Sequence, residues 1–260
     1  MRLSDTHCHL NLEAYDTDRD DVIGRAAAAG VERFLVIGFD LKSSLRASEL
    51  SARSGLFAAI GIHPESAEEW GGGAASQLSA MWAQGGGGVR AYGEIGLDYH
   101  WESVPRARQQ AVFLEQLRFA SDLSPKLPVI IHCREAFDDV LAVLAESAVD
   151  NPIVMHCFIG DDRAARQCVD RGYTLGIGGV LTYKKSVDLR AAVASVPMDC
   201  LILETDCPYL PPQPWRGKRN EPSYITAVAE TLATVRGIPV AEVAEATARN
   251  ADRLFGWGEL

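Results

Sequence analysis

Arg2-Leu3-Ser4-Asp5-Thr6-His7-Cys8-His9-Leu10 is the stretch that decides the fold class, because it contains the first strand and the residues directly after it. The run from Arg2 to Thr6 is strand-like, and two histidines stand at its end. An open, doubly wound nucleotide-binding sheet usually carries a glycine-rich phosphate loop at this point. The sequence has His7-Cys8-His9 there instead and so favours another kind of parallel sheet.

Short apolar runs alternate with stretches of helical periodicity along the rest of the chain. Eight runs rich in Val, Ile and Leu are Arg2 to Thr6, Arg33 to Ile37, Leu56 to Gly61, Val89 to Ile95, Leu127 to His132, Pro152 to Cys157, Tyr173 to Ile177 and Cys200 to Thr205. Helical segments lie between them, including Asp18 to Ala29, Ser43 to Ser54, Arg106 to Leu123, Ala136 to Ala148 and Asp161 to Arg171. Eight such alternations imply a parallel sheet, and eight strands close a barrel. We predict an α/β fold, a (β/α)8 TIM barrel forming a single domain over residues 1–260, with C-terminal helices at about 223–255 packed on it.

The composition is that of a soluble globular protein, with 47% hydrophobic and 23% charged residues. No run approaches the roughly 20 apolar residues that cross a bilayer. The N-terminus lacks the apolar core of a secretory signal, so we expect a cytoplasmic protein with no membrane partner. A chain of this length can bury a large core without disulfides, so the six cysteines are expected to be free thiols.

The net charge of −10 argues against a protein that coats nucleic acid through its overall field. Two small basic clusters stand in segments that we interpret as loops. They are Lys184 with Lys185, and Arg216 with Lys218 and Arg219. Aromatic residues accompany them, including Tyr183, Tyr209 and Trp215. Such loops suit an unpaired nucleic-acid end better than a long duplex, although ordinary loop packing explains each aromatic residue about as well.

Four of the six histidines stand at the carboxyl ends of predicted strands. His7 and His9 are two residues apart, so side-chain alternation places both imidazoles on one face of the strand. His132 and His156 end the fifth and sixth apolar runs. One histidine beside an apolar run is usually a satisfied core residue, but four at one end of a barrel favour a metal site.

Two carboxylates are expected at the same end of the barrel. Glu94 closes the fourth apolar run, and Asp206 follows the eighth, next to the first strand in barrel order. The predicted metal ligands are His7, His9, Glu94, His132, His156 and Asp206. Two divalent ions would lower the pKa of a bridging water, and Asp206 would take its proton as a general base. The resulting hydroxide can attack a phosphodiester, a carboxyl ester or an amide.

Taken together, the motifs resemble the TatD-type metal-dependent deoxyribonucleases of the amidohydrolase superfamily. The segments that carry the resemblance are Asp5-Thr6-His7-Cys8-His9-Leu10, Gly61-Ile62-His63-Pro64, Gly93-Glu94-Ile95-Gly96-Leu97-Asp98-Tyr99, His132-Cys133-Arg134, His156-Cys157-Phe158, Glu204-Thr205-Asp206-Cys207-Pro208-Tyr209-Leu210 and Arg249-Asn250-Ala251-Asp252-Arg253-Leu254-Phe255. Phe158-Ile159-Gly160 departs from the family pattern, which usually has a small hydroxyl residue at its middle position.

The resemblance implies a cofactor of two divalent ions, Mg, Mn or Zn. His7, His9, Glu94 and Asp206 would hold one ion, and Glu94, His132 and His156 the other. It implies a 3′-5′ exonuclease that acts on DNA ends, and the basic and aromatic loops favour single-stranded ends. The predicted catalytic residues are Asp206 and Glu94. His63 and Arg134 are expected to contact substrate, and Glu204 to contact substrate or orient a ligand.

Two other functions fit the same residues. One is a hydrolase of this fold that acts on a small ester, lactone or amide, or on aminoacyl-tRNA esters. The other is a non-catalytic binding barrel with structural metals, which a ligand set shared by two ions makes improbable. No obligate protein partner is inferred from the sequence.

Overall fold

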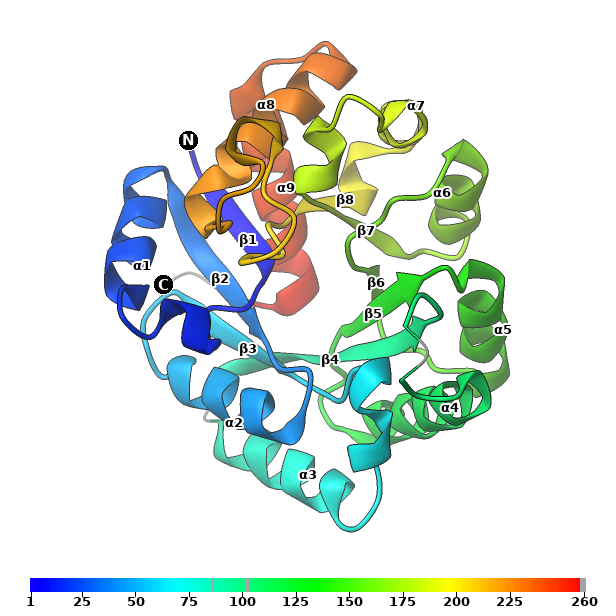
Figure 1. The fold of residues 1–260 in the computed structure, drawn as a ribbon. Helices are drawn as coiled ribbons and strands as arrows, with labels where there is room; N and C mark the ends of the chain where they lie inside the picture. Colours follow the sequence, from blue (N-terminus) through cyan, green and yellow to red (C-terminus); the bar gives the residue numbers. More distant parts are fainter. Residues whose placement is uncertain (86, 102, 258–260) are drawn as a thin grey trace. The chain divides into compact units, whose positions relative to one another are not determined.

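A computed structural model of the chain describes residues 1–85, 87–101 and 103–257. It divides into two compact units. Unit 1 comprises Met1–Val36 and Met155–Leu260, of which residues 258–260 lie outside the described part, and unit 2 comprises Ile37–Val154. Figure 1 shows the ribbon of both units, coloured along the sequence.

The strands of the described chain follow one another in the sheet in the order of the sequence. They are β1 (Leu3–Cys8), β2 (Val31–Ile37), β3 (Leu56–Ile60), β4 (Val89–Asp98), β5 (Val129–Arg134), β6 (Ile153–Met155), β7 (Thr174–Ile177) and β8 (Leu201–Leu203). Pairing is parallel for β1 with β2, β3 with β4, β4 with β5, and β7 with β8. Past the end of β8, the Asp206 amide donates to the His7 carbonyl at 2.8 Å, and Cys8 forms a parallel bridge with Cys207. The predicted α/β barrel class of eight parallel strands is confirmed.

Helices alternate with these strands. They are α1 (Arg19–Ala28), α2 (Leu41–Leu50), α3 (Ala74–Gln84), α4 (Arg106–Asp122), α5 (Phe137–Ser147), α6 (Asp162–Val169), α7 (Val187–Ser195), α8 (Ile225–Arg236) and α9 (Val240–Phe255). Short 3-10 turns include η2 (Pro64–Glu69), η3 (Gly179–Thr182), η4 (Met198–Cys200) and η6 (Pro222–Tyr224). No helix in the described part of the chain is long and apolar enough to cross a membrane.

The C-terminal helix α9 packs on β1 and β8 within unit 1 (Figure 1). The buried Asn250 amide donates to the carbonyls of Met198 and Leu201 at 2.7 and 2.8 Å, where β8 begins. Asp252 forms ion pairs with Arg2 and Arg33 at the start of β1 and β2. These contacts attach the end of the chain to the amino ends of the strands, opposite to the ends where the predicted ligands stand.

Two buried glutamines of α4 hold the β3 and β4 ends within unit 2. The Gln116 amide donates to the Ile62 carbonyl at 2.8 Å and accepts from the Ile62 amide at 3.0 Å. Gln109 accepts from the Asp98 amide and donates to the Asp98 carbonyl, both at 2.9 Å. A primary amide can satisfy a backbone N–H and a backbone C=O together, so it can be buried without an unpaired polar group.

The fourth strand is longer than the sequence suggested. We expected it to end at Glu94 or Ile95, but β4 continues to Asp98 after a register shift between Tyr92 and Ile95. Glu94 therefore lies inside the strand. The six cysteines are free thiols, as predicted.

Candidate metal centre

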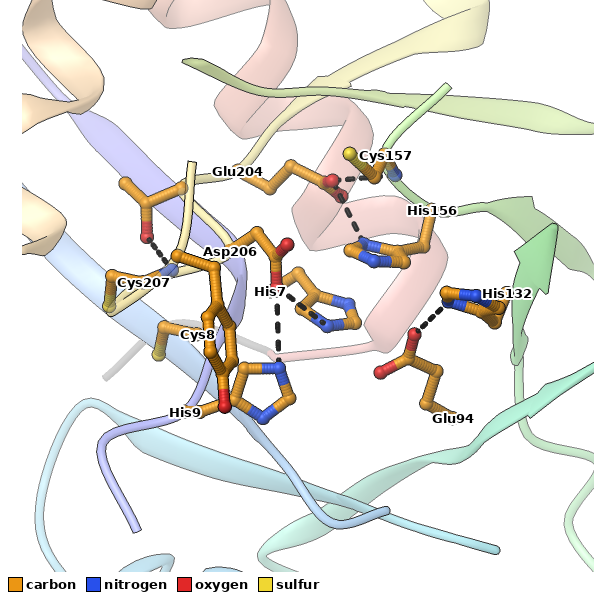
Figure 2. Close-up of polar contacts among 12 residues, drawn as sticks. His7, Cys8, His9, Glu94, His132, His156, Cys157, Glu204, Asp206 and Cys207 are labelled. Atoms are coloured by element: carbon orange, nitrogen blue, oxygen red, sulfur yellow. Dashed lines mark hydrogen bonds and ion pairs between the residues drawn. The ribbon is translucent and has the colours of Figure 1, made fainter. Parts of the chain in front are cut away.

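Unit 1 brings four of the predicted ligands together at the carboxyl ends of its strands. His7 lies in β1 and His9 just past it, while His156 follows β6 and Asp206 follows β8. The Asp206 Oδ1 atom lies 3.7 Å from His7 Nε2 and 3.3 Å from His9 Nε2. Figure 2 shows the carboxylate pointing toward both rings. All four residues are buried.

His156 stacks on His7 and is backed by a second carboxylate. The two rings lie 3.5 Å apart between centroids, with 15° between their planes. The Glu204 Oε1 atom lies 2.9 Å from His156 Nδ1 and accepts a 2.7 Å hydrogen bond from the Cys157 amide (Figure 2). Glu204 is buried and in contact with a predicted ligand, so its position is that of a residue that orients His156.

A buried aspartate fixes the segment that carries Asp206. Asp5 in β1 accepts hydrogen bonds from the Thr205 amide at 2.9 Å and the Thr205 hydroxyl at 2.6 Å. Burial raises the pKa of Asp5 to about 8, although the hydrogen bonds from Thr205 act in the opposite direction. This contact ties β1 to the residue directly before Asp206, which has a left-handed backbone with φ of +55°. The left-handed conformation costs a non-glycine residue about 1–2 kcal/mol and persists only where its surroundings enforce it.

Asp206 is held in its ionised form. Burial on its own raises the pKa of this carboxyl, but hydrogen bonding to His9 and the charges of His156, His7 and His9 more than compensate, so the pKa is lowered overall. A carboxylate of this kind can coordinate a cation at neutral pH, and it is deprotonated when a proton has to be accepted.

Unit 2 brings Glu94 and His132 together in the same way. Glu94 Oε1 lies 2.8 Å from His132 Nδ1 (Figure 2), and Asp98 Oδ2 lies 2.9 Å from His132 Nε2. The hydrogen bond and charge of His132 lower the pKa of Asp98 against the opposing effect of burial, which is the largest single influence. His63 completes this group, with its ring 4.3 Å from that of His132 and its Nε2 atom 3.9 Å from Glu94 Oε1.

Asp98 is the residue of this group that sequence reasoning did not assign. Its signal was present, because Glu94 and Asp98 are four residues apart in one strand and alternation places both on the same face. The apolar run suggested that the strand ends before Asp98. With that boundary, Asp98 is not expected to share a strand face with Glu94. Asp98 Oδ1 also accepts from the backbone amides of His100 and Trp101, at 2.9 and 3.3 Å, and this holds the loop after β4.

Arg134 ends β5 and lies over the ring of Trp101, with 5.7 Å between its Cζ atom and the ring centroid. If Arg134 does not bind a phosphate of the substrate, the alternative role for its guanidinium is an ion pair with a nearby acid. No such pair involving Arg134 occurs among the residues that the structure describes. Trp101 is 50% exposed, so this cation–aromatic pair faces solvent at the carboxyl end of β5.

Both groups have the chemistry and the spacing of metal sites. Imidazole nitrogens and carboxylate oxygens bind Zn2+ and Mn2+, and carboxylates also bind Mg2+. Two ligand atoms about 2.1 Å from one ion stand roughly 3.0–3.4 Å apart at ordinary coordination angles. The distance from Asp206 to His9 lies in that range, and the distance to His7 is slightly longer. His7, His156 and Asp206 in unit 1, and His63, Asp98 and His132 in unit 2, are each close enough to share one ion.

Comparison with known proteins agrees with this chemistry. The family model described as TatD related DNase matches residues 4–256. The chain is 43% identical to the uncharacterized metal-dependent hydrolase YabD of Bacillus subtilis, over 97% of this chain and 98% of the relative. It is 38% identical to the 3′-5′ ssDNA/RNA exonuclease TatD of Cronobacter sakazakii, over 96% of this chain and 97% of the relative.

Solved structures give the same result for the fold. The crystal structure of YjjV, a TatD homologue from Escherichia coli, superposes with a TM-score of 0.92 at 33% identity and covers 99% of both chains. A TatD family hydrolase from Entamoeba histolytica superposes with a TM-score of 0.89 at 22% identity, which supports the fold alone. The chain belongs to the TatD-related DNase family.

Proposed function

We propose that this metal-dependent hydrolase of the TatD family is a 3′-5′ exonuclease that cleaves phosphodiester bonds at single-stranded DNA ends. The observation that carries the proposal is the buried group of His7, His9, His156 and Asp206, with a carboxylate kept ionised among imidazoles. A relative covered almost end to end bears the name of a 3′-5′ exonuclease for single-stranded DNA and RNA. That name supports a nucleic-acid substrate for this chain.

The residues of each unit have separate parts in this proposal. A divalent ion is bound in unit 1 by His7, His9, His156 and Asp206. In unit 2, the residues that bind a divalent ion are Glu94 and His132. The allocation of two ions with Glu94 shared between them, which the family resemblance implies, stays a prediction. When bound, such ions activate water and neutralise charge on the phosphate.

Asp206 is proposed to accept the proton of the attacking water. Its carboxylate is deprotonated at neutral pH and stands at the carboxyl end of the strands, where barrel enzymes carry their active sites. Glu204 holds His156 by its Nδ1 atom, so Nε2 is the nitrogen that can bind an ion. His63 and Arg134 are proposed as phosphate contacts. The His63 ring lies beside Glu94 and His132 and can donate a hydrogen bond, and the Arg134 guanidinium offers a positive charge at the end of β5.

One assay tests this function. Metal-stripped protein is reloaded separately with magnesium, manganese or zinc and given 5′-labelled single-stranded DNA, the RNA of the same sequence and a chromogenic carboxyl ester. We expect stepwise shortening of DNA from the 3′ end with at least one metal. Asp206→Asn should lower that rate about 100-fold or more, the usual contribution of a general base, while Asp188→Asn on the surface of α7 should not.

The same assay separates the rival functions. Intact DNA under every metal, together with ester cleavage that Asp206→Asn abolishes, would show a hydrolase of small esters. Equal rates on DNA and RNA would widen the substrate class to single-stranded nucleic acid. Absence of all three activities in protein that retains stoichiometric metal would favour a binding barrel with structural metals.

A further inference from the structure

The loops after β7 and β8 contain several aromatic and basic residues, and the structure separates those used for packing from those directed to solvent. Trp215 stacks on Tyr224 with 4.0 Å between ring centroids and 6° between planes. Arg219 binds Asp18 and the Ala14 carbonyl. These residues are occupied within the fold, so the ordinary packing interpretation holds for them.

Tyr209 is 53% exposed, although it stands beside a predicted ligand. Its ring makes an edge contact with the ring of His9, with 5.8 Å between centroids and 73° between planes. Exposure of a large ring at the carboxyl end of the strands has no packing benefit. It provides an aromatic surface that a flat ligand can cover.

The backbone that carries Tyr209 is held on both sides. The Tyr209 amide donates to the Asp206 carbonyl at 2.9 Å, and its carbonyl accepts from Asn220 Nδ2 at 2.7 Å. Asn220 is fully buried, and its amide nitrogen also donates to the Thr205 carbonyl at 2.8 Å. Leu210, the next residue, has a left-handed backbone with φ of +47°. The ring therefore rests on a fixed turn, and little conformational entropy is lost when a ligand stacks on it.

A cation lies farther along the same loop, between β8 and α8. The Arg216 Cζ atom is 4.4 Å from the centroid of the Tyr183 ring, and the Tyr183 hydroxyl donates to the Pro211 carbonyl at 3.0 Å. Burial raises the pKa of Tyr183, and the charge of Asp206 adds to that while Arg216 opposes it, so all three groups share one electrostatic neighbourhood. Within the described residues no carboxylate forms an ion pair with Arg216. Its guanidinium contacts the Tyr183 side chain, and its charge is left for a phosphate to neutralise.

We propose that the exposed face of Tyr209 stacks on the 3′-terminal base of a single strand, and that Arg216 binds a phosphate of the same strand. The proposal rests on the proposed nuclease function and adds the residues that position the end of the substrate. Base–aromatic stacking is tolerant of sequence, so this contact selects an unpaired end rather than a particular base. A paired end would have to open before its base could reach the ring.

Binding tests the proposal without cleavage. The metal-loaded protein is titrated with a single strand whose last linkages are phosphorothioates and whose 3′-terminal base is 2-aminopurine. Quenching of its fluorescence reports stacking. We expect quenching with the wild type and with Tyr209→Phe, and a dissociation constant about 5- to 100-fold higher with less quenching for Tyr209→Ala. Tyr173→Ala, at the opposite end of β7, is the matched control and should bind as the wild type does.

Cleavage rates provide a second test, in which a change in the protein is combined with a change in the substrate, as in a double-mutant cycle. Strands ending in a normal nucleotide or in an abasic one are compared in wild type and Tyr209→Ala. We expect the Tyr209→Ala loss in kcat/KM, mainly through KM, on the normal strand and no further loss on the abasic strand. Arg216→Ala should reduce the salt dependence of binding by about one unit of slope, and Arg249→Ala should leave it unchanged.

The outcomes of these arms are distinct. Equal binding and quenching by wild type and Tyr209→Ala, or equal losses on both strands, would overturn the stacking role while the nuclease function stands. If the wild type cleaves no strand, the proposed function fails, and the fluorescence titration still decides whether Tyr209 stacks on a terminal base. An unchanged salt slope for Arg216→Ala would remove the phosphate contact.

Discussion

At the scale of single residues, two of the predicted histidine ligands are backed by carboxylates. Glu204 lies 2.9 Å from His156 Nδ1, and Asp98 lies 2.9 Å from His132 Nε2. A carboxylate of this kind fixes the ring orientation and raises the basicity of the nitrogen that binds the ion. We therefore predict parallel roles for Glu204 and Asp98, which stand in different units.

Replacement of Asp98 should weaken metal binding at His132. Asp98→Asn keeps the Oδ1 acceptor for the amides of His100 and Trp101 but removes the charge next to the ring. We expect about 10- to 100-fold weaker binding of one ion, measured by calorimetric titration of metal-stripped protein with zinc or manganese. Asp139→Asn is the control, because Asp139 in α5 binds the Tyr99 hydroxyl and Gln110 and not the histidine group. Unchanged affinity at every site in Asp98→Asn would show that Asp98 has no such role.

At the scale of elements, the pairing of β4 with β5 depends on a glycine. Gly96 pairs with His132 and has φ of +144°, a conformation that L side chains rarely adopt. A Cβ atom at this position would lie 2.0 Å from the His132 carbonyl oxygen. The absence of a side chain is what allows the two strands to pair at the level of a predicted ligand.

Gly96→Ala should destabilise unit 2 and displace His132. We expect a loss of about 2 kcal/mol or more in the free energy of unfolding, because both the backbone conformation and the strand contact oppose a side chain. Gly24→Ala is the matched control, since a Cβ there meets nothing within 4 Å and Gly24 lies in α1. That substitution should stabilise by about 0.5–1 kcal/mol. Urea unfolding of both variants checks the pair, and equal effects would contradict the argument.

An ion pair joins α1 to the turn before α8. The Arg25 guanidinium donates to both oxygens of Glu221, with a shortest distance of 2.7 Å, and the Ser223 hydroxyl donates to Glu221 Oε1. Burial raises the pKa of Glu221, but the hydrogen bonds from Arg25 and Ser223 and the charge of Arg25 lower it by a larger amount. The pKa of Glu221 therefore lies below the usual value of 4.5. A depressed pKa means that the unfolded chain binds the proton more readily than the folded one.

The stability contributed by Glu221 should therefore be present above pH 4.5 and be lost as the pH falls through the lower folded pKa. Arg25 is half exposed, so we expect only about 1 kcal/mol. The difference in unfolding free energy between wild type and Glu221→Gln should be near this value at pH 7 and should shrink toward zero below pH 4. Urea unfolding across that range measures it, and a difference that grows on acidification would contradict the assignment.

The pattern of apolar residues along the sequence predicted strands and helices that are defined by their own residues. It did not predict features that depend on contacts between residues distant in the sequence. The ligands could be predicted because each stands at or just past the end of an apolar run, and parallel strands bring their carboxyl ends to one side. The extension of β4 to Asp98 was not recognisable, since the backbone of Asp98 is held by hydrogen bonds to the side chain of Gln109 in the distant helix α4. Likewise the stacking of Trp215 on Tyr224 and the 53% exposure of Tyr209 are set by tertiary packing.

At the scale of the whole molecule, the net charge of −10 opposes binding of a polyanion. The cations near the carboxyl ends of β7 and β8 are few, because Arg219 is engaged by Asp18. Lys184 and Lys185 stand exposed beside Tyr183, and Arg216 lies over its ring. A strand bound here meets attraction from a small number of local charges and repulsion from the rest of the surface.

The salt dependence of single-strand binding should accordingly be shallow. One to three phosphates contacted by local cations correspond to a slope of about −0.7 to −2 in a plot of log affinity against log salt. A Lys184→Ala/Lys185→Ala double variant should weaken binding, whereas Arg163→Ala/Arg249→Ala changes the net charge equally at exposed positions on α6 and α9 and should have little effect. Fluorescence anisotropy of a labelled single strand at several salt concentrations measures both. A slope steeper than about −5, or equal losses in the two double variants, would mean that an extended charged surface rather than the loops after β7 and β8 governs binding.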